Sequence, residues 1–127
     1  MHPSELLYSL DHIWCKKEAD GNIRLGITYY YQEQLKTIVY VELLPAGSRI
    51  KRGDPFGSIE SSKASTDMLS PLSGMVVAVN TAIPEKPVLV NKDPYGQGWL
   101  LLVEPSHTEE LKSLLSSQEY LASVQQK

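Results

Sequence analysis

Short apolar runs, separated by turn-forming residues, constrain this chain more than any other feature of its sequence. Asp20-Gly21 lies between the runs Ile13–Lys17 and Ile23–Thr28, and an Asp-Gly pair in that setting is the strongest short-range signal for a β-hairpin. Strands that alternate with turn signals about every 8–12 residues predict a β-sandwich or barrel. We therefore expect a mainly β fold, built as a single domain over residues 1–127.

The composition suits one ordinary globular core and excludes several classes of function. The chain is 42% hydrophobic and 21% charged, and its net charge of −3 argues against a nucleic-acid-binding surface. The longest apolar runs fall far short of the roughly 18 residues of a membrane span. Cys15 is the single cysteine, so no disulfide can close within the chain. We expect a cytoplasmic monomer that binds neither nucleic acid nor membrane.

The C-terminal segment has a different periodicity from the rest of the chain. Ser106 and Glu109 have the spacing of a capping box, and leucines follow at helical spacing. We expect a helical tail over about residues 106–124, weakened at Ser116-Ser117. Earlier in the chain, three tyrosines follow the strand at 23–28, and we expect them to pack in the core and on the surface; if the strand continues, Tyr29 and Tyr31 are directed inward and Tyr30 outward.

No metal site or catalytic residue stands out in the sequence. His12 and Cys15 lie three residues apart, but His2 and His107 are distant in the chain, so no set reaches three or four ligands with a recognisable spacing. We expect a structural role for His12 and a partly buried thiol at Cys15.

The segment at about 53–74 carries the clearest functional signal. A strand rises to Ser61, turns through Ser62-Lys63-Ala64 and returns toward Pro71. Lys63 therefore stands at a protruding tip between small neighbours. A lysine at a polar tip is protonated at neutral pH and is a poor nucleophile, which disfavours a Schiff-base enzyme. It is well placed to be acylated by another enzyme, which would remove its charge and add a flexible arm.

The residues around this lysine resemble the lipoyl-lysine hairpin of the glycine cleavage system H protein family. That family reads approximately Glu-Ser-Val-Lys-Ala, with an Asp four residues after the lysine and a Ser-Gly pair further on. The matching residues here are Glu60-Ser61-Ser62-Lys63-Ala64, Asp67 and Ser73-Gly74. A biotinyl hairpin has methionine on each side of its lysine, so Ser62 and Ala64 disfavour biotin.

The resemblance extends over nearly the whole chain and implies a fold and a modification. Its other matches include Tyr8-Ser9, His12-Ile13-Trp14, Gly26-Ile27-Thr28, Leu89-Val90-Asn91 and Gly98-Trp99. It implies a lipoyl-domain-like barrel-sandwich hybrid with a C-terminal helix. It also implies lipoate attached through an amide to Lys63, with Asp67 at the base of the arm. Glu60 and Gly74 would be recognised by a lipoate ligase or lipoyl transferase.

The family's role is that of a carrier rather than an enzyme. The resemblance implies that glycine decarboxylase loads an aminomethyl group on the arm, that an aminomethyltransferase unloads it, and that dihydrolipoyl dehydrogenase reoxidises the arm. Ile13 and Tyr30 stand where the family usually has a glutamate and a histidine, so we expect a less polar cleft beside the arm. The alternative is an H-protein-like lipoate-binding protein that carries sulfur intermediates for heterodisulfide-reductase-like enzymes. The hairpin alone does not separate these two roles.

Overall fold

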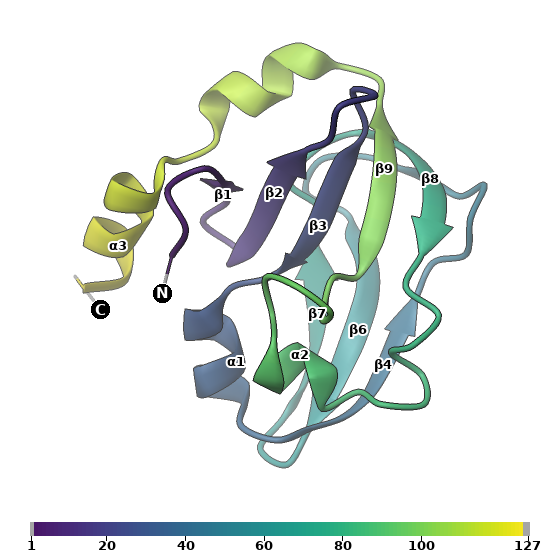
Figure 1. The fold of residues 1–127 in the computed structure, drawn as a ribbon, viewed down its shortest axis with the longest axis vertical. Coiled ribbons are helices and arrows are strands. Elements are labelled where there is room, and N and C mark those ends of the chain that lie inside the picture. The colour runs from purple at the N-terminus through teal and green to yellow at the C-terminus, as the bar shows by residue number, and fades with distance from the viewer. Residues whose placement is uncertain (1, 126–127) are drawn as a thin grey trace.

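Two antiparallel sheets form the framework of the structure, a computed structural model that describes residues 2–125 (Figure 1). The larger sheet has the strand order β1-β2-β3-β9-β8-β5 and the smaller one has the order β4-β6-β7. The strands are β1 (Leu7–Tyr8), β2 (Ile13–Lys17), β3 (Ile23–Ile27), β4 (Ile38–Leu43), β5 (Arg49–Ile50), β6 (Pro55–Ser61), β7 (Ser65–Leu69), β8 (Gly74–Val79) and β9 (Leu101–Pro105). The mainly β prediction is confirmed.

The helical segments lie at the margins of the sheets. They are α1 (Tyr29–Leu35), α2 (Leu89–Lys92), the 3-10 helix η1 (Thr108–Ser113) and α3 (Ser117–Gln125). None of the helices within residues 2–125 has the length and apolar character needed to cross a membrane.

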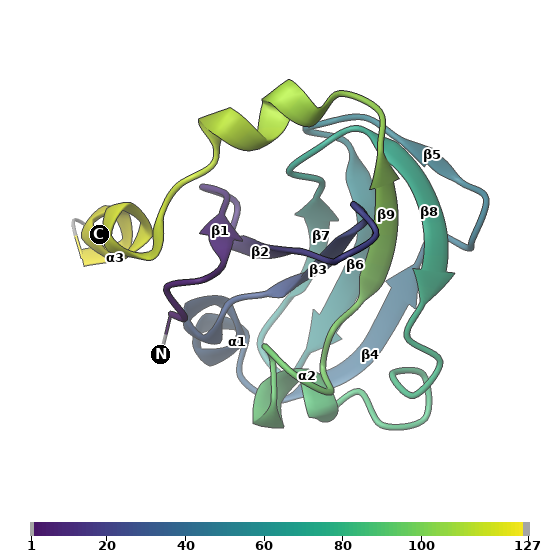
Figure 2. The ribbon, with the colours of Figure 1, turned by 45° about the horizontal axis from the view of Figure 1, so that its top comes forward.

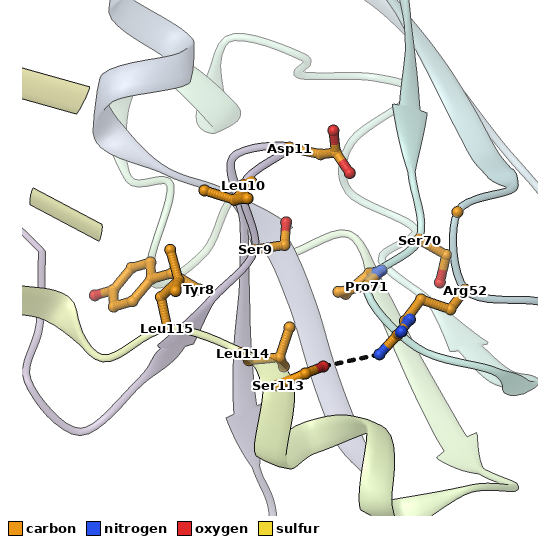
Figure 3. A pocket seen from close by; sticks show the side chains of 11 residues that line it. Tyr8, Ser9, Leu10, Asp11, Arg52, Ser70, Pro71, Ser113, Leu114 and Leu115 are labelled. Atoms are coloured by element: carbon orange, nitrogen blue, oxygen red, sulfur yellow. Dashed lines mark hydrogen bonds between the residues drawn. The ribbon is translucent and has the colours of Figure 1, made fainter. Parts of the chain in front are cut away.

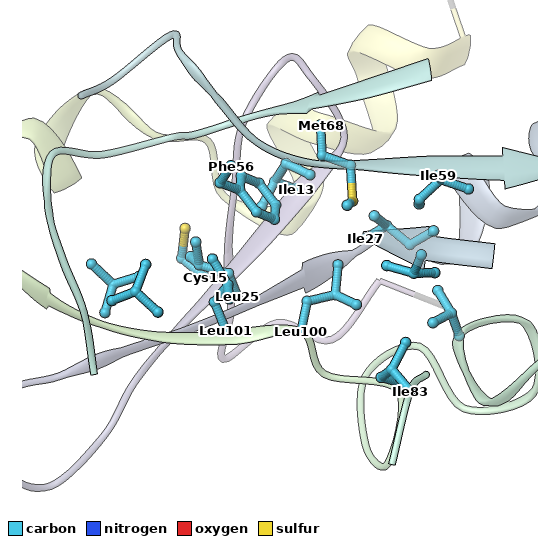
Figure 4. Close-up of a cluster of buried hydrophobic side chains, with 14 of the residues drawn as sticks. Ile13, Cys15, Leu25, Ile27, Phe56, Ile59, Met68, Ile83, Leu100 and Leu101 are labelled. Carbon is cyan, nitrogen blue, oxygen red and sulfur yellow. The ribbon is translucent and has the colours of Figure 1, made fainter. Parts of the chain in front are cut away.

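The main core forms where the two sheets face each other (Figure 4). Ile13 and Ile27, which are opposite one another in the β2–β3 pair, pack with Phe56 and Met68 of the smaller sheet. Cys15 also lies in this core, with only 3% of its surface exposed, so the expectation of a partly buried thiol is wrong. Burial raises the pKa of that thiol, because the core solvates a thiolate poorly.

The tyrosine run forms helix α1 instead of extending strand β3. Thr28 has extended backbone angles and its hydroxyl oxygen accepts a hydrogen bond from the N–H of Tyr31 at 3.2 Å, which is the geometry of an N-cap. The helix then buries Gln32 and Leu35, a spacing of three that one helical face provides. The strand therefore ends before the tyrosines, because a cap and a buried helical face outweigh the β preference of tyrosine.

The C-terminal tail is helical in two pieces, and its capping box lies ten residues later than expected. Ser116 N–H donates to the Glu119 carboxylate at 2.9 Å, and Glu119 N–H donates to the Ser116 hydroxyl at 3.2 Å. The N-cap of η1 makes no side-chain hydrogen bond. Between the two helices Leu115 pairs with Tyr8, through backbone N···O distances of 2.8 and 2.7 Å, which interrupts the helix. Figure 2 shows the tail crossing from β9 to place α3 beside β1.

Candidate functional site

The turn between β6 and β7 presents Lys63 at one end of the smaller sheet, where β4 also begins. The strands pair from Pro55 and Leu69 up to Glu60 and Ser65, which leaves residues 62–64 as the turn. Lys63 is exposed. The hairpin and its tip therefore lie where the sequence predicts them.

Ser61 builds the shape of this turn, and sequence reasoning did not single it out. Its hydroxyl oxygen accepts hydrogen bonds from the N–H groups of Lys63 at 3.2 Å and Ala64 at 3.1 Å. The same hydroxyl lies 3.0 Å from the carbonyl oxygen of Ala64, to which it donates. One side chain thus satisfies three backbone groups of the tip. A serine two residues before a turn residue is the local signal that could have shown this.

Within residues 2–125 no carboxylate forms an ion pair with the ammonium of Lys63. The one ion pair in that part of the chain with atoms closer than 4.0 Å joins Arg24 and Glu18. Arg24 belongs to the larger sheet, whereas this turn belongs to the smaller one. Glu60 and Asp67 are exposed on the hairpin strands, and Glu60 lies opposite Ser65 next to the turn. The tip therefore presents an exposed lysine, and the carboxylates of Glu60 and Asp67 lie on the two strands that lead to it.

Gly74 is not part of the hairpin that carries the other predicted site residues. It begins β8, where it pairs with Ile50 of β5 and with Pro105 of β9, and it is buried. A Cβ at this position would collide with the carbonyl oxygen of Glu104 and come within 2.9 Å of the side chain of Val103. The close approach of two strands thus gives Gly74 a packing role in the larger sheet.

A pocket of about 340 Å³ lies beside β7 and includes Asp67 in its wall. Asp11 supplies a second carboxylate, His12 an imidazole and Tyr31 a phenol, whose oxygen is 3.5 Å from the Thr66 hydroxyl. The lining is completed by Leu10, Thr66 and Leu69. Asp11 and Tyr31 were not anticipated, because only the folded chain brings these segments next to the hairpin.

The pocket has a polar lining to which Ile13 does not contribute. That side chain is fully buried in the main core, opposite Ile27, and it does not line the pocket. The lining tyrosine is Tyr31, whereas Tyr30 contributes a ring whose centroid is 5.1 Å from that of His12. Two carboxylates and an imidazole therefore remain beside the hairpin despite the isoleucine.

A second hollow, of about 300 Å³, lies under the C-terminal tail (Figure 3). Leu10 and Asp11 line both hollows, so their turn forms a shared wall. Arg52 closes the second hollow by donating to the Ser113 hydroxyl at 2.8 Å. Within the described residues no group of three or more histidine, cysteine or acidic side chains could hold a metal ion.

The sheet order, the tail and the lysine hairpin together define a lipoyl-domain-like barrel-sandwich hybrid with a C-terminal helix. A crystal structure of a glycine cleavage system H protein from Mycobacterium marinum superposes with a TM-score of 0.88 at 36% identity, covering 97% of this chain and 98% of that one. The family model for the glycine cleavage H-protein matches residues 6–127. The chain belongs to the glycine cleavage H-protein family.

Two curated relatives agree with this assignment over nine-tenths or more of their length. A glycine cleavage system H protein from Oceanobacillus iheyensis is 45% identical, and the match covers 97% of each chain. One from Carboxydothermus hydrogenoformans is 49% identical over 93% of this chain and 90% of its own.

Proposed function

We propose that this H protein carries lipoate on Lys63, joined through an amide to the side-chain nitrogen. The exposed tip carries the proposal, because Ser61 holds the turn and no carboxylate of residues 2–125 pairs with the ammonium. A lipoate ligase or lipoyl transferase must grip the hairpin to reach this amine. Glu60, exposed next to the turn, is the side chain that we assign to that recognition.

The arm carries an aminomethyl group between the enzymes of glycine cleavage. Glycine decarboxylase loads the dithiol, an aminomethyltransferase unloads it, and dihydrolipoyl dehydrogenase reoxidises it. The protein contributes no catalytic residue and serves as a substrate of each partner in turn. It acts as a cytoplasmic monomer, and the free, buried thiol of Cys15 is in keeping with a reducing compartment.

The pocket beside β7 supports a cationic cargo. An amine on the loaded arm is positively charged at neutral pH, and the carboxylates of Asp11 and Asp67 favour a cation placed between them. Oxidised sulfur intermediates are anionic, and the same two carboxylates would repel them. This charge, together with relatives that carry the H-protein name, favours the aminomethyl group over a sulfur cargo.

The test combines modification with cargo loading. The chain is incubated with a lipoate ligase, lipoate and ATP, and its intact mass is compared with those of Lys63→Arg and of Lys51→Arg, a matched control at another exposed lysine. We expect one lipoyl adduct on the parent and on Lys51→Arg, and none on Lys63→Arg. Exchange of labelled bicarbonate into glycine by glycine decarboxylase should then require the adduct. An adduct on Lys63→Arg, or exchange without lipoate, would overturn the proposal.

A further inference from the structure

A tyrosine of the C-terminal helix connects the tail to the pocket beside the hairpin. Tyr120 is fully buried, and its hydroxyl oxygen lies 2.7 Å from Nδ1 of His12 and 2.8 Å from the hydroxyl oxygen of Thr28. Its ring stacks on Tyr8 with centroids 5.0 Å apart and planes 13° from parallel. The phenol therefore reaches the pocket wall at His12 and the N-cap of α1 at Thr28 together.

His12 has an uncommon backbone conformation that hydrogen bonds hold in place, and its ring is oriented by side-chain contacts. His12 has a φ of 71°, in the left-handed region that few residues other than glycine occupy. Its N–H donates to Ser9 and its carbonyl accepts from Thr28, both at 3.1 Å, so the backbone is held on both sides. The ring is then located by the hydroxyl of Tyr120 at one nitrogen and by the neighbouring rings of Tyr30 and Tyr31.

Only one assignment of donors and acceptors gives each hydroxyl proton of Thr28 and Tyr120 an acceptor. Thr28 already accepts the N–H of Tyr31, and its own proton needs an acceptor because the side chain is buried. Among the described residues that acceptor is the oxygen of Tyr120. Tyr120 then donates its proton to Nδ1 of His12, so the neutral imidazole carries its proton on Nε2. In the reverse order the Thr28 proton would have no acceptor.

We infer that Tyr120 is a positioning residue, which holds His12 in the Nε2–H form in the pocket wall beside Asp11 and Asp67. The effect of this arrangement on a loaded arm rests on the proposed function, whereas the position of the proton on His12 does not. The wall of the pocket then contains an imidazole with a fixed proton position, together with two carboxylates, and we expect this arrangement to slow the attack of water on a loaded arm. Helix α3 has nine residues, too few to be stable alone, so the tail holds this proton arrangement only while it is docked.

The first measurement uses the unmodified chain. Long-range ¹H–¹⁵N spectra of the imidazoles, assigned with single histidine substitutions, report which nitrogen of His12 carries the proton. We expect the Nε2–H form in the parent and a mixture of forms in Tyr120→Phe, which keeps the ring stacked on Tyr8. Tyr95→Phe is the matched control, since it removes a hydroxyl that bonds His2 and the N–H of Tyr29 and does not touch His12. A proton on Nδ1 in the parent, or an unchanged His12 in Tyr120→Phe, would overturn the assignment.

The second measurement follows the loaded arm. After loading by glycine decarboxylase, formaldehyde released without aminomethyltransferase reports loss of the cargo. We expect release about five-fold faster from Tyr120→Phe, the ratio that corresponds to one hydrogen bond of about 1 kcal/mol, and an unchanged rate from Tyr95→Phe. A changed tautomer with an unchanged release rate would refute the effect on the cargo. If the parent chain is never loaded, the proposed function fails, while the spectra still decide the role of Tyr120.

Discussion

Gly74 lies so close to the backbone carbonyl of Glu104, across the β8–β9 pair, that no side chain fits between them. Replacement by alanine must push the two strands apart, which costs about 1–3 kcal/mol in well-packed proteins. We expect Gly74→Ala to lower the free energy of unfolding in urea by that amount. Lipoylation of the folded fraction should continue. A parental stability combined with lost lipoylation would show instead that the glycine is read directly by the modifying enzyme.

Ser61 should control how well Lys63 is presented. Removal of its hydroxyl in Ser61→Ala leaves the two N–H groups of the turn without their acceptor, so the tip loses its fixed shape. We expect slower lipoylation and a loss of stability of about 1 kcal/mol or less. Ser62→Ala is the matched control, because the hydroxyl of Ser62 has no hydrogen-bond partner within residues 2–125. Equal initial rates of lipoylation for the two variants would rule out this role.

Glu60 should matter to recognition and not to stability. Its carboxylate is exposed and makes no ion pair within the described residues, so Glu60→Gln should change the free energy of unfolding by less than about 0.5 kcal/mol. We expect a lower rate of lipoylation at limiting ligase. Glu42→Gln removes another exposed carboxylate of the same small sheet and should be modified at the parental rate. If both substitutions lower the rate of lipoylation equally, the ligase responds to the overall charge of the carrier and not to Glu60.

Replacement of Ile13 by the glutamate that is usual in the family should destabilise the protein. The sequence alone suggests that Ile13→Glu would improve the hold on a cationic arm. The structure places the side chain in the main core between the sheets, where a carboxylate would be buried without a partner. We expect Ile13→Glu to cost about 4 kcal/mol or more, visible as a large drop in thermal midpoint. Ile13→Val should cost only about 0.5–1.5 kcal/mol. A stable Ile13→Glu would mean that this strand can turn its side chain toward the pocket.

Alkaline pH should weaken the packing around β1 and α3. Burial raises the pKa of Tyr95 to about 12, from an ordinary value of 10.0, although its hydrogen bond with the N–H of Tyr29 acts in the opposite direction. Because the folded pKa is the higher one, the stability contributed is complete below about pH 10 and is lost as the pH rises toward about 12. Urea titrations across that range should show a smaller loss in Tyr95→Phe. Tyr40→Phe, at an exposed residue, should follow the parent, and identical curves for all three chains would exclude the effect.

Local signals predicted the hairpins, because their causes lie within a few residues. Asp20-Gly21 forms the β2–β3 turn, with Gly21 at a φ of 89°, and the lysine turn closes through Ser61. The helical tail lies where it was predicted, but its capping box was assigned to the wrong pair, because Ser106 with Glu109 and Ser116 with Glu119 have the same spacing. Only the second pair caps a helix.

Contacts between distant parts of the chain account for the other features that the sequence did not predict. The pairing of Leu115 with Tyr8, more than a hundred residues away, decides where the last helix begins. The pocket joins Asp11, Tyr31 and Asp67, which come from three separate segments, so no local pattern could have grouped them. The exposed lysine turn was predictable from a motif, whereas the pocket beside it depends on tertiary packing.

The turn built by Ser61 sets where movement of the proposed lipoyl arm would start. Three hydrogen bonds of the Ser61 hydroxyl hold the backbone around Lys63, so the motion of a group attached there would begin at the α-carbon of that lysine. On the proposed function every partner enzyme must reach the same short turn. Two partners would then compete for it, and we expect an excess of one to inhibit the reaction of another.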